Sequence, residues 1–211
     1  MGWKEALTFT RYGKSFQKYR RLFQGYLKSQ KIMSYQPMQT QATRILLQSL
    51  LSDERRKEDW LRRLGIIHYL TDILFSTSII MQVAYGHRIT SDEDPYINLT
   101  KEASYALGNA GPPGNTPIDF FPILQHLPSW FPGTYYAGFA RAQNGTIKRL
   151  YDYPFDKVKA EMAAGTAKHS FVYDTLESIG HNGLEDANDF LDIKGTAATM
   201  YCAGAETVRK M

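Results

Sequence analysis

Apolar residues recur at intervals of three and four along most of this chain, which is the spacing of one face of an α-helix. This pattern predicts helices near residues 14–30, 36–52, 55–63, 66–85, 96–108, 134–163, 166–178 and 187–209. Repeated prolines between Asn109 and Gly133 predict an ordered, aromatic-rich connection with at most short helices. No internal repeat or low-complexity tract divides the 211 residues, so we expect one all-α domain over residues 1–211.

The last predicted helix carries the most informative polar residues. The chain has no charge from Gly195 to Ala205, and then Glu206 and Thr207 follow side by side. On a helix, the residues that step by three and four share one face, and here they are Ile193, Thr196, Met200, Ala203 and Thr207.

Gly204 lies within this predicted helix, where glycine costs about 1 kcal/mol relative to alanine and usually has a packing or functional reason. It would let another group approach the backbone. The Thr207 hydroxyl can bond back to the carbonyl of Ala203 or Gly204, which bends a helix and opens a groove. A groove beside Glu206 and Thr207 could hold a small polar ligand and relay protons to it. The alternative is a tightly packed helix in which Glu206 is simply the first solvated residue.

A second group of residues lies near the start of the chain. The helix predicted from Lys14 has an apolar arc with Arg20 at its edge, while Lys18 and Arg21 point away. Residues 14–28 contain no Asp or Glu, so a half-buried Arg20 would need an anion from elsewhere in the fold or from a ligand. The alternative is that Arg20 extends from an amphipathic face into water. The arc consists of Phe16, Tyr19, Leu22, Phe23, Tyr26 and Leu27.

Several segments together resemble the cytochrome P450 family of haem-thiolate monooxygenases, in the order in which that family has them. The resemblance is to the fungal microsomal branch typified by O-methylsterigmatocystin oxidoreductase, and it implies the mainly α portion from helix C to helix I. The segments are Gly2 to Phe9, Tyr12-Gly13, Phe16 to Phe23, Tyr85-Gly86, Asp94-Pro95-Tyr96, Ile118 to Leu124, Leu127 to Gly133, Ala164 to Ala167 and Lys194 to Thr207.

The resemblance implies a role for each matching residue in the oxygen chemistry. Glu206 and Thr207 would be catalytic and would steer protons and water so that the O–O bond is cleaved and peroxide is not released. Met200 and Cys202 would face the substrate, which the resemblance implies is a small apolar organic molecule oxidised by O2. The small residues Ala203 and Gly204 would line the groove over the haem.

The resemblance also assigns roles on the first long helix. Arg20 would pair with a haem propionate, and this pairing would supply the anion that its own segment lacks. Phe16 occupies the position whose tryptophan usually donates to the same propionate, and phenylalanine cannot donate. Lys18 and Arg21 would lie on the face that docks an NADPH-dependent reductase, the electron donor.

The thiolate ligand of the family is missing from this sequence. The only cysteine is Cys202, and the Phe-x-x-Gly context of the family's ligand loop does not precede it. The Glu-x-x-Arg helix of the family is absent too. We therefore expect a fragment truncated at both ends that does not bind haem stably by itself and is inactive alone, although its parent binds haem. The five histidines show no metal-ligand spacing, so we predict no metal site within the chain.

Composition and hydropathy give no sign of a nucleic-acid or membrane-spanning protein. The net charge is only +4, and the basic residues lie mostly on solvated helix faces, so we expect no nucleic-acid partner. No segment reaches the ~20 apolar residues of a membrane span, and the start of the chain does not resemble a signal peptide. The resemblance implies a parent on the cytosolic face of the endoplasmic reticulum, held by an N-terminal anchor. A different class remains open, namely a non-catalytic helical remnant that binds partners or lipids.

Reversing the charges of both Lys18 and Arg21 in a complete enzyme is expected to slow its reduction, because an acidic reductase would lose its docking surface. Stopped-flow reduction measures this rate, and an unchanged rate would contradict the docking role.

Overall fold

Helices make up the regular structure of this chain. The computed structural model describes residues 2–51, 75–89, 93–111, 114, 116–182 and 187–207, and no strand occurs among them. The predicted all-α fold is therefore confirmed. The helices with both ends described are η1 (Trp3–Glu5), η2 (Leu7–Phe9), α1 (Lys14–Tyr26), α2 (Ser29–Ser34), α3 (Gln36–Leu51), α5 (Pro95–Gly108), α6 (Pro117–Phe120), η4 (Pro122–His126), α7 (Tyr135–Ala163), α8 (Phe171–Asn182) and α9 (Ala187–Thr207). Helical backbone also covers residues 75–85.

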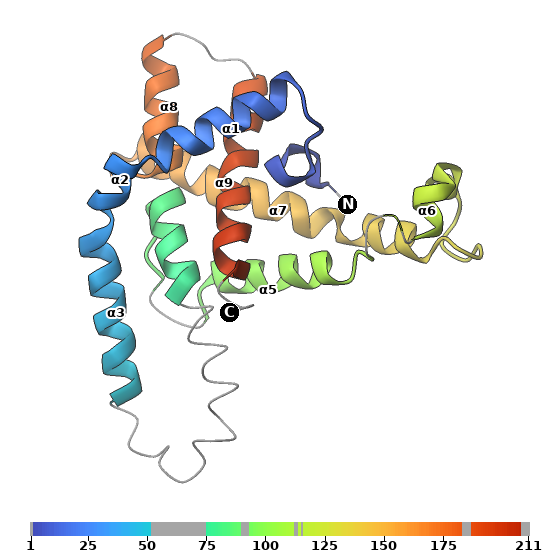
Figure 1. Cartoon of the computed structure of the whole chain (residues 1–211), viewed down its shortest axis with the longest axis horizontal. Coiled ribbons are helices and arrows are strands. Elements are labelled where there is room, and N and C mark those ends of the chain that lie inside the picture. Colours follow the sequence, from blue (N-terminus) through green and yellow to red (C-terminus); the bar gives the residue numbers. More distant parts are fainter. Residues whose placement is uncertain are drawn as a thin grey trace.

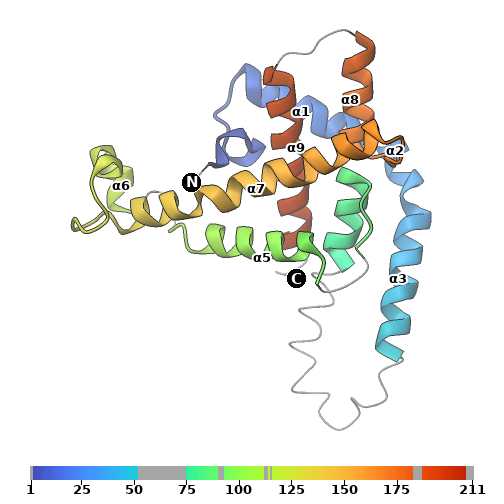
Figure 2. The ribbon, with the colours of Figure 1, turned by 180° about the vertical axis from the view of Figure 1, so that it is seen from behind.

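Helix α9 runs through the middle of the molecule, between α1 on one side and α7 on the other (Figures 1 and 2). α5 runs alongside α7 and contacts α9 as well, and η1 and η2 pack on α9 near α1. The hydrophobic core lies where these helices meet. Its largest fully buried side chains include Tyr85, Tyr96, Phe155, Met200 and Tyr201.

Small and uncharged residues allow α9 to be covered on so many sides. Gly195 is the tightest point, because a Cβ atom there would lie 2.0 Å from the backbone oxygen of Glu5. One turn later, the Thr199 hydroxyl accepts a hydrogen bond from the Leu7 N–H at 3.1 Å and donates to the Gly195 carbonyl at 2.8 Å. The absence of a side chain at Gly195 and the hydroxyl of Thr199 together dock the start of the chain on α9.

Most helix boundaries agree with the sequence predictions to within two residues. α5 begins at Pro95 because Asp94 caps it, its carboxylate accepting from the Tyr96 N–H at 3.0 Å. The first long helix was predicted to reach residue 30, but α1 ends at Tyr26 and α2 starts separately at Ser29. The helix predicted at 55–63, and residues 66–74 of the one predicted at 66–85, lie outside the described residues.

The helix predicted at 166–178 was placed wrongly, because α8 begins at Phe171. Gly165 adopts a left-handed conformation with φ of 69°, and the N–H groups of Thr166 and Ala167 both donate to the Glu161 carbonyl. These bonds close the end of α7, and residues 166–170 that follow are not helical. The Ser170 hydroxyl then accepts from the Tyr173 N–H at 3.2 Å, which starts α8.

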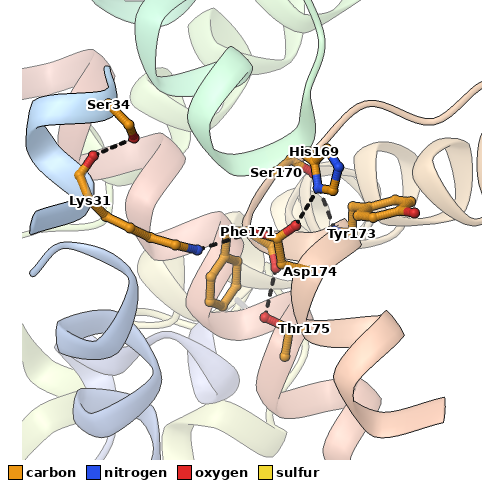
Figure 3. A network of polar contacts seen from close by, with 8 residues as sticks. All are labelled: Lys31, Ser34, His169, Ser170, Phe171, Tyr173, Asp174 and Thr175. Atoms are coloured by element: carbon orange, nitrogen blue, oxygen red, sulfur yellow. Dashed lines mark hydrogen bonds and ion pairs between the residues drawn. The ribbon is translucent and has the colours of Figure 1, made fainter. Parts of the chain in front are cut away.

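A polar network ties α2 to the beginning of α8 (Figure 3). The Asp174 carboxylate contacts the Lys31 ammonium at 3.1 Å and the His169 Nδ1 atom at 3.0 Å. Lys31 also lies 3.8 Å from the centre of the Tyr26 ring, at the end of α1. This network holds the α1–α2 junction against α8.

The connection at 109–133 contains only short helices in its described part, as predicted. Arg141 of α7 holds it by donating to the backbone carbonyl of Gln125 at 2.7 Å and to that of Leu127 at 3.2 Å. Four aromatic side chains on this connection are exposed to solvent. They are Phe120 (67%), Phe121 (64%), Trp130 (80%) and Phe131 (40%).

Replacing Gly195 by alanine is expected to destabilise the fold by about 1–3 kcal/mol or more, because the new methyl group meets backbone that cannot yield locally. Gly145→Ala is the matched control, since Gly145 also lies within a long helix and nothing approaches its Cβ position within 4 Å. It should stabilise by about 0.5–1 kcal/mol. Chemical denaturation of both variants measures the difference, and equal effects would contradict the close approach of Glu5.

Candidate functional site

The predicted face of α9 passes from the core to the surface near the end of the helix. Ile193 and Met200 are 1% exposed and Thr196 is fully buried, whereas Ala203 is exposed. The helix continues to Thr207, so the backbone of Glu206 and Thr207 is helical. The side chains of both residues lie outside the described part of the structure.

The close approach expected at Gly204 is present, and the group that approaches is Ile80. A Cβ atom on Gly204 would lie 2.8 Å from Ile80 Cγ1 and 2.9 Å from Ile80 Cβ. Ile80 belongs to the helical segment 75–85, so this glycine seats that segment against the end of α9. Sequence reasoning missed Ile80, because nothing local in an apolar helix indicates its partner.

A buried hydroxyl pair fixes α9 on α5 just before the Ala203–Thr207 segment. The Tyr201 hydroxyl pairs with that of Thr100 and also donates to the Tyr96 carbonyl. Burial raises the pKa of Tyr201, so its hydroxyl stays protonated and keeps its role as a donor. Sequence reasoning missed this pair too. The sequence feature that could have indicated this pair is Tyr201 itself, a tyrosine within a stretch of small residues. No sequence feature distinguishes Thr100.

The two predicted substrate residues face the interior of this chain. Met200 packs in the core. Cys202 is half-buried and lines a cavity of about 10 Å³ between η1, α5 and α9, together with Trp3, Ala103 and Leu107. Such a cavity has room for about one water molecule and none for an organic substrate.

The predicted cofactor and partner residues on α1 differ in their surroundings. Phe16 is half-buried against Tyr12, with ring centres 5.6 Å apart, while Arg20 and Arg21 are exposed. No carboxylate in the described part of the chain pairs with Arg20. Its exposure agrees with the alternative of an arginine that extends into water. Lys18 differs from both arginines, because it pairs with Asp189 at 2.6 Å and with Asp192.

These positions can be tested against the haem that the resemblance implies. An exposed arginine without a described acidic partner fits a propionate, and the exposed small side chain of Ala203 fits the close approach of a flat ring. Neither observation requires haem. Cys202 does not fit an iron ligand, because it lines an enclosed apolar cavity and does not share the exposed side of α9 with Ala203. The exposure of Arg20 and Ala203 is thus compatible with contact to haem, whereas the surroundings of Cys202 do not fit an iron ligand.

The fold and the site define an all-α chain built around a helix that ends in a small-residue, acid–alcohol motif. The sequence model of the family described as cytochrome P450 matches residues 1–209. The chain therefore belongs to the cytochrome P450 family, whose cofactor is haem and whose curated fungal members include proteins named monooxygenases.

Curated relatives support the assignment. The chain is 28% identical over 205 residues to cytochrome P450 monooxygenase 176 of Postia placenta, covering 97% of this chain and 37% of that protein. It is 30% identical to a cytochrome P450 monooxygenase of Armillaria gallica, covering 98% and 39%. It is 26% identical to tryptamine 4-monooxygenase of Psilocybe cyanescens, covering 98% and 38%. No solved structure gives a significant match.

These relatives confirm the predicted fungal likeness, and the chain spans well under half of their length. The finer likeness to the O-methylsterigmatocystin oxidoreductase branch stays a prediction. None of the helices in the described ranges has the length and hydropathy needed to cross a membrane.

Replacing Gly204 by alanine is expected to cost about 1–3 kcal/mol of stability by forcing Ile80 aside. Truncating Ile80 to alanine removes the Cγ1 and Cδ1 atoms, so the double variant should recover part of that cost. A double-mutant cycle by chemical denaturation measures the coupling. Additive effects within about 0.5 kcal/mol would show that the two residues do not touch.

Proposed function

We propose that this chain is the helix C to helix I portion of a haem-dependent monooxygenase. The complete enzyme would insert one oxygen atom from O2 into a small apolar organic substrate, with electrons from an NADPH-dependent reductase. The observation that carries this proposal is the family match over residues 1–209, which includes the whole Ala203-Gly204-Ala205-Glu206-Thr207 motif.

The proposed roles are those that the resemblance to the family implies for the matching residues. Haem, when bound, supplies the redox chemistry that activates dioxygen. Ala203 and Gly204 would give the ring a surface without bulky side chains, and Arg20 would bind a propionate, with Phe16 beside it. Glu206 would hold a proton and Thr207 would orient water at the end of α9, so that these two residues would deliver protons in order. Met200 and Cys202 would influence the shape of the substrate pocket indirectly, by packing beneath the residues that line it.

The remaining proposals concern the parent protein. The iron ligand would come from a part of the parent outside this chain, because Cys202 faces the interior. We also propose that the parent is located on the cytosolic face of the endoplasmic reticulum. An N-terminal anchor would hold it there, and the four exposed aromatic side chains at 120–131 are available for contact with the membrane.

A non-catalytic helical remnant is the second candidate, because the same exposed aromatic surface could bind lipids or a partner without any oxygen chemistry. The transcript separates the two candidates. The monooxygenase proposal expects it to continue beyond Met211 with a Glu-x-x-Arg helix and a Phe-x-x-Gly…Cys loop, whereas a stop codon at that point would favour the remnant.

The 211-residue chain, supplied with haem, reduced and exposed to carbon monoxide, is expected to show no band at the thiolate-ligated Soret position, because Cys202 is unavailable to iron. The complete enzyme read from the transcript should show that band. In the complete enzyme, Thr207→Ala should raise the peroxide released per NADPH consumed, by about tenfold or more if proton delivery is lost. A thiolate band in the chain alone would overturn the assignment of Cys202 as an interior residue.

A further inference from the structure

Lys18 of α1 binds two carboxylates of α9. Its ammonium lies 2.6 Å from Asp189 Oδ1 and also contacts Asp192. The Asp189 and Asp192 side chains are 22% and 13% exposed, so the pair is screened less than a solvated surface pair. The Lys18 side chain is 45% exposed, but the two carboxylates offset its charge, so it attracts an acidic partner less than an unpaired lysine would.

Tyr19, the neighbour of Lys18, strengthens the same contact. Its side chain is 6% exposed, and the pKa of its hydroxyl is raised to about 12, first by burial and next by the Asp192 carboxylate. Hydrogen bonds to Asp189 and Asp192 outweigh the effect of burial on Lys18, so its pKa is raised as well. Consecutive residues of α1 therefore converge on one buried carboxylate of α9.

We propose that Lys18, Tyr19, Asp189 and Asp192 form a clamp that fixes the roll of α1 on α9, and that Lys18 is therefore a positioning residue. On a helix, Arg20 lies about 200° around the axis from Lys18, so holding Lys18 on α9 fixes the direction in which Arg20 points. The clamp would thereby place the proposed propionate-binding arginine relative to the Ala203–Thr207 segment. This last step rests on the proposed function, whereas the clamp itself does not.

The clamp also gives Lys18 and Arg21 different roles, although the sequence predicted one docking role for both. Arg21 is exposed and pairs with no carboxylate in the described ranges, so its charge is available to a partner. Lys18 is engaged by α9. A docking role would therefore rest on Arg21, and the effect of Lys18 on haem reduction would come through the placement of α1.

The chain contains a matched control for the clamp. Lys194, also on α9, contacts Asp152 at 2.6 Å and Asp156 at 3.8 Å. These two aspartates lie on α7 and are 53% and 66% exposed. Lys194→Gln thus removes from α9 a lysine that binds two aspartates of α7, and it leaves the contacts of α1 intact.

Hydrogen exchange in the full chain tests the clamp without haem. Lys18→Gln should speed amide exchange in α1 by about tenfold or more, because Asp192 loses its charged partner, and Lys18→Arg should restore most of the protection. Lys194→Gln and Arg21→Gln should leave α1 unchanged. If Lys18→Gln perturbs the whole fold, Asp189→Asn removes the more exposed contact and should give a smaller loss confined to α1.

Fluorotyrosine incorporation with 19F NMR gives an independent reading. Replacing Asp192 by asparagine should lower the pKa of Tyr19 measurably, because a neighbouring negative charge is removed. Unchanged exchange in α1 for Lys18→Gln, together with an unchanged Tyr19 titration for Asp192→Asn, would overturn the clamp.

The complete enzyme tests the link to haem. Lys18→Gln should shift the Soret band and slow reduction with little dependence on salt, with rescue by Lys18→Arg, whereas Arg21→Gln should slow reduction in a salt-dependent way without a spectral shift. Equal, salt-dependent effects of the two variants would overturn the positioning role. If α1 loosens in the full chain but the complete enzyme never shows a haem band, the proposed function fails and the clamp stands as a structural tie.

Discussion

The contact between the Glu5 backbone and Gly195 is the constraint on which the arrangement around α9 depends. A helix without charge from Gly195 to Ala205 is stable in water only if other elements cover it. Helices α1, α5 and α7 cover part of α9, and η1 and η2 pack on it as well. Those short helices can reach α9 only where it lacks a side chain. Thr199 then pairs with the Leu7 N–H, a donor whose burial without a partner would be costly.

Two polar ties set the register of α9 once it is buried. Near its beginning, Asp192 is held from α1 by Lys18, and nearer its end Tyr201 is held from α5 by Thr100. Apolar packing alone tolerates sliding, whereas a buried carboxylate or hydroxyl loses its partner if the helix moves by one residue. The first tie is charged and partly solvated, and the second is neutral and fully buried. Different conditions would loosen them, since salt weakens only the first.

Periodicity was sufficient to predict most helices, because each is decided by residues close together in sequence. The failure at 166–178 has a local cause that periodicity does not include, namely the left-handed Gly165 and the two N–H groups that bond back to Glu161. The site was harder to predict, because its contacts join distant segments. Lys18 and Arg21 have the same charge and lie on the same face of α1, and only the aspartates 171 and more residues away distinguish them. Ile80 and Thr100 were missed for the same reason.

Because residues of the proposed site are exposed, we infer that this chain forms only one side of that site. The face of α9 is buried as far as Met200 and then opens at Ala203, while Arg20 is exposed on α1. A small side chain at the end of a core helix costs little when solvated, and neither does an arginine, so both are stable in this chain as it stands. Binding energy for a large flat cofactor would have to come from surfaces that bury these residues. Since the chain spans only 35–39% of four of its fungal relatives, the proposal is that the remaining parts of such a protein supply those surfaces and the iron ligand together.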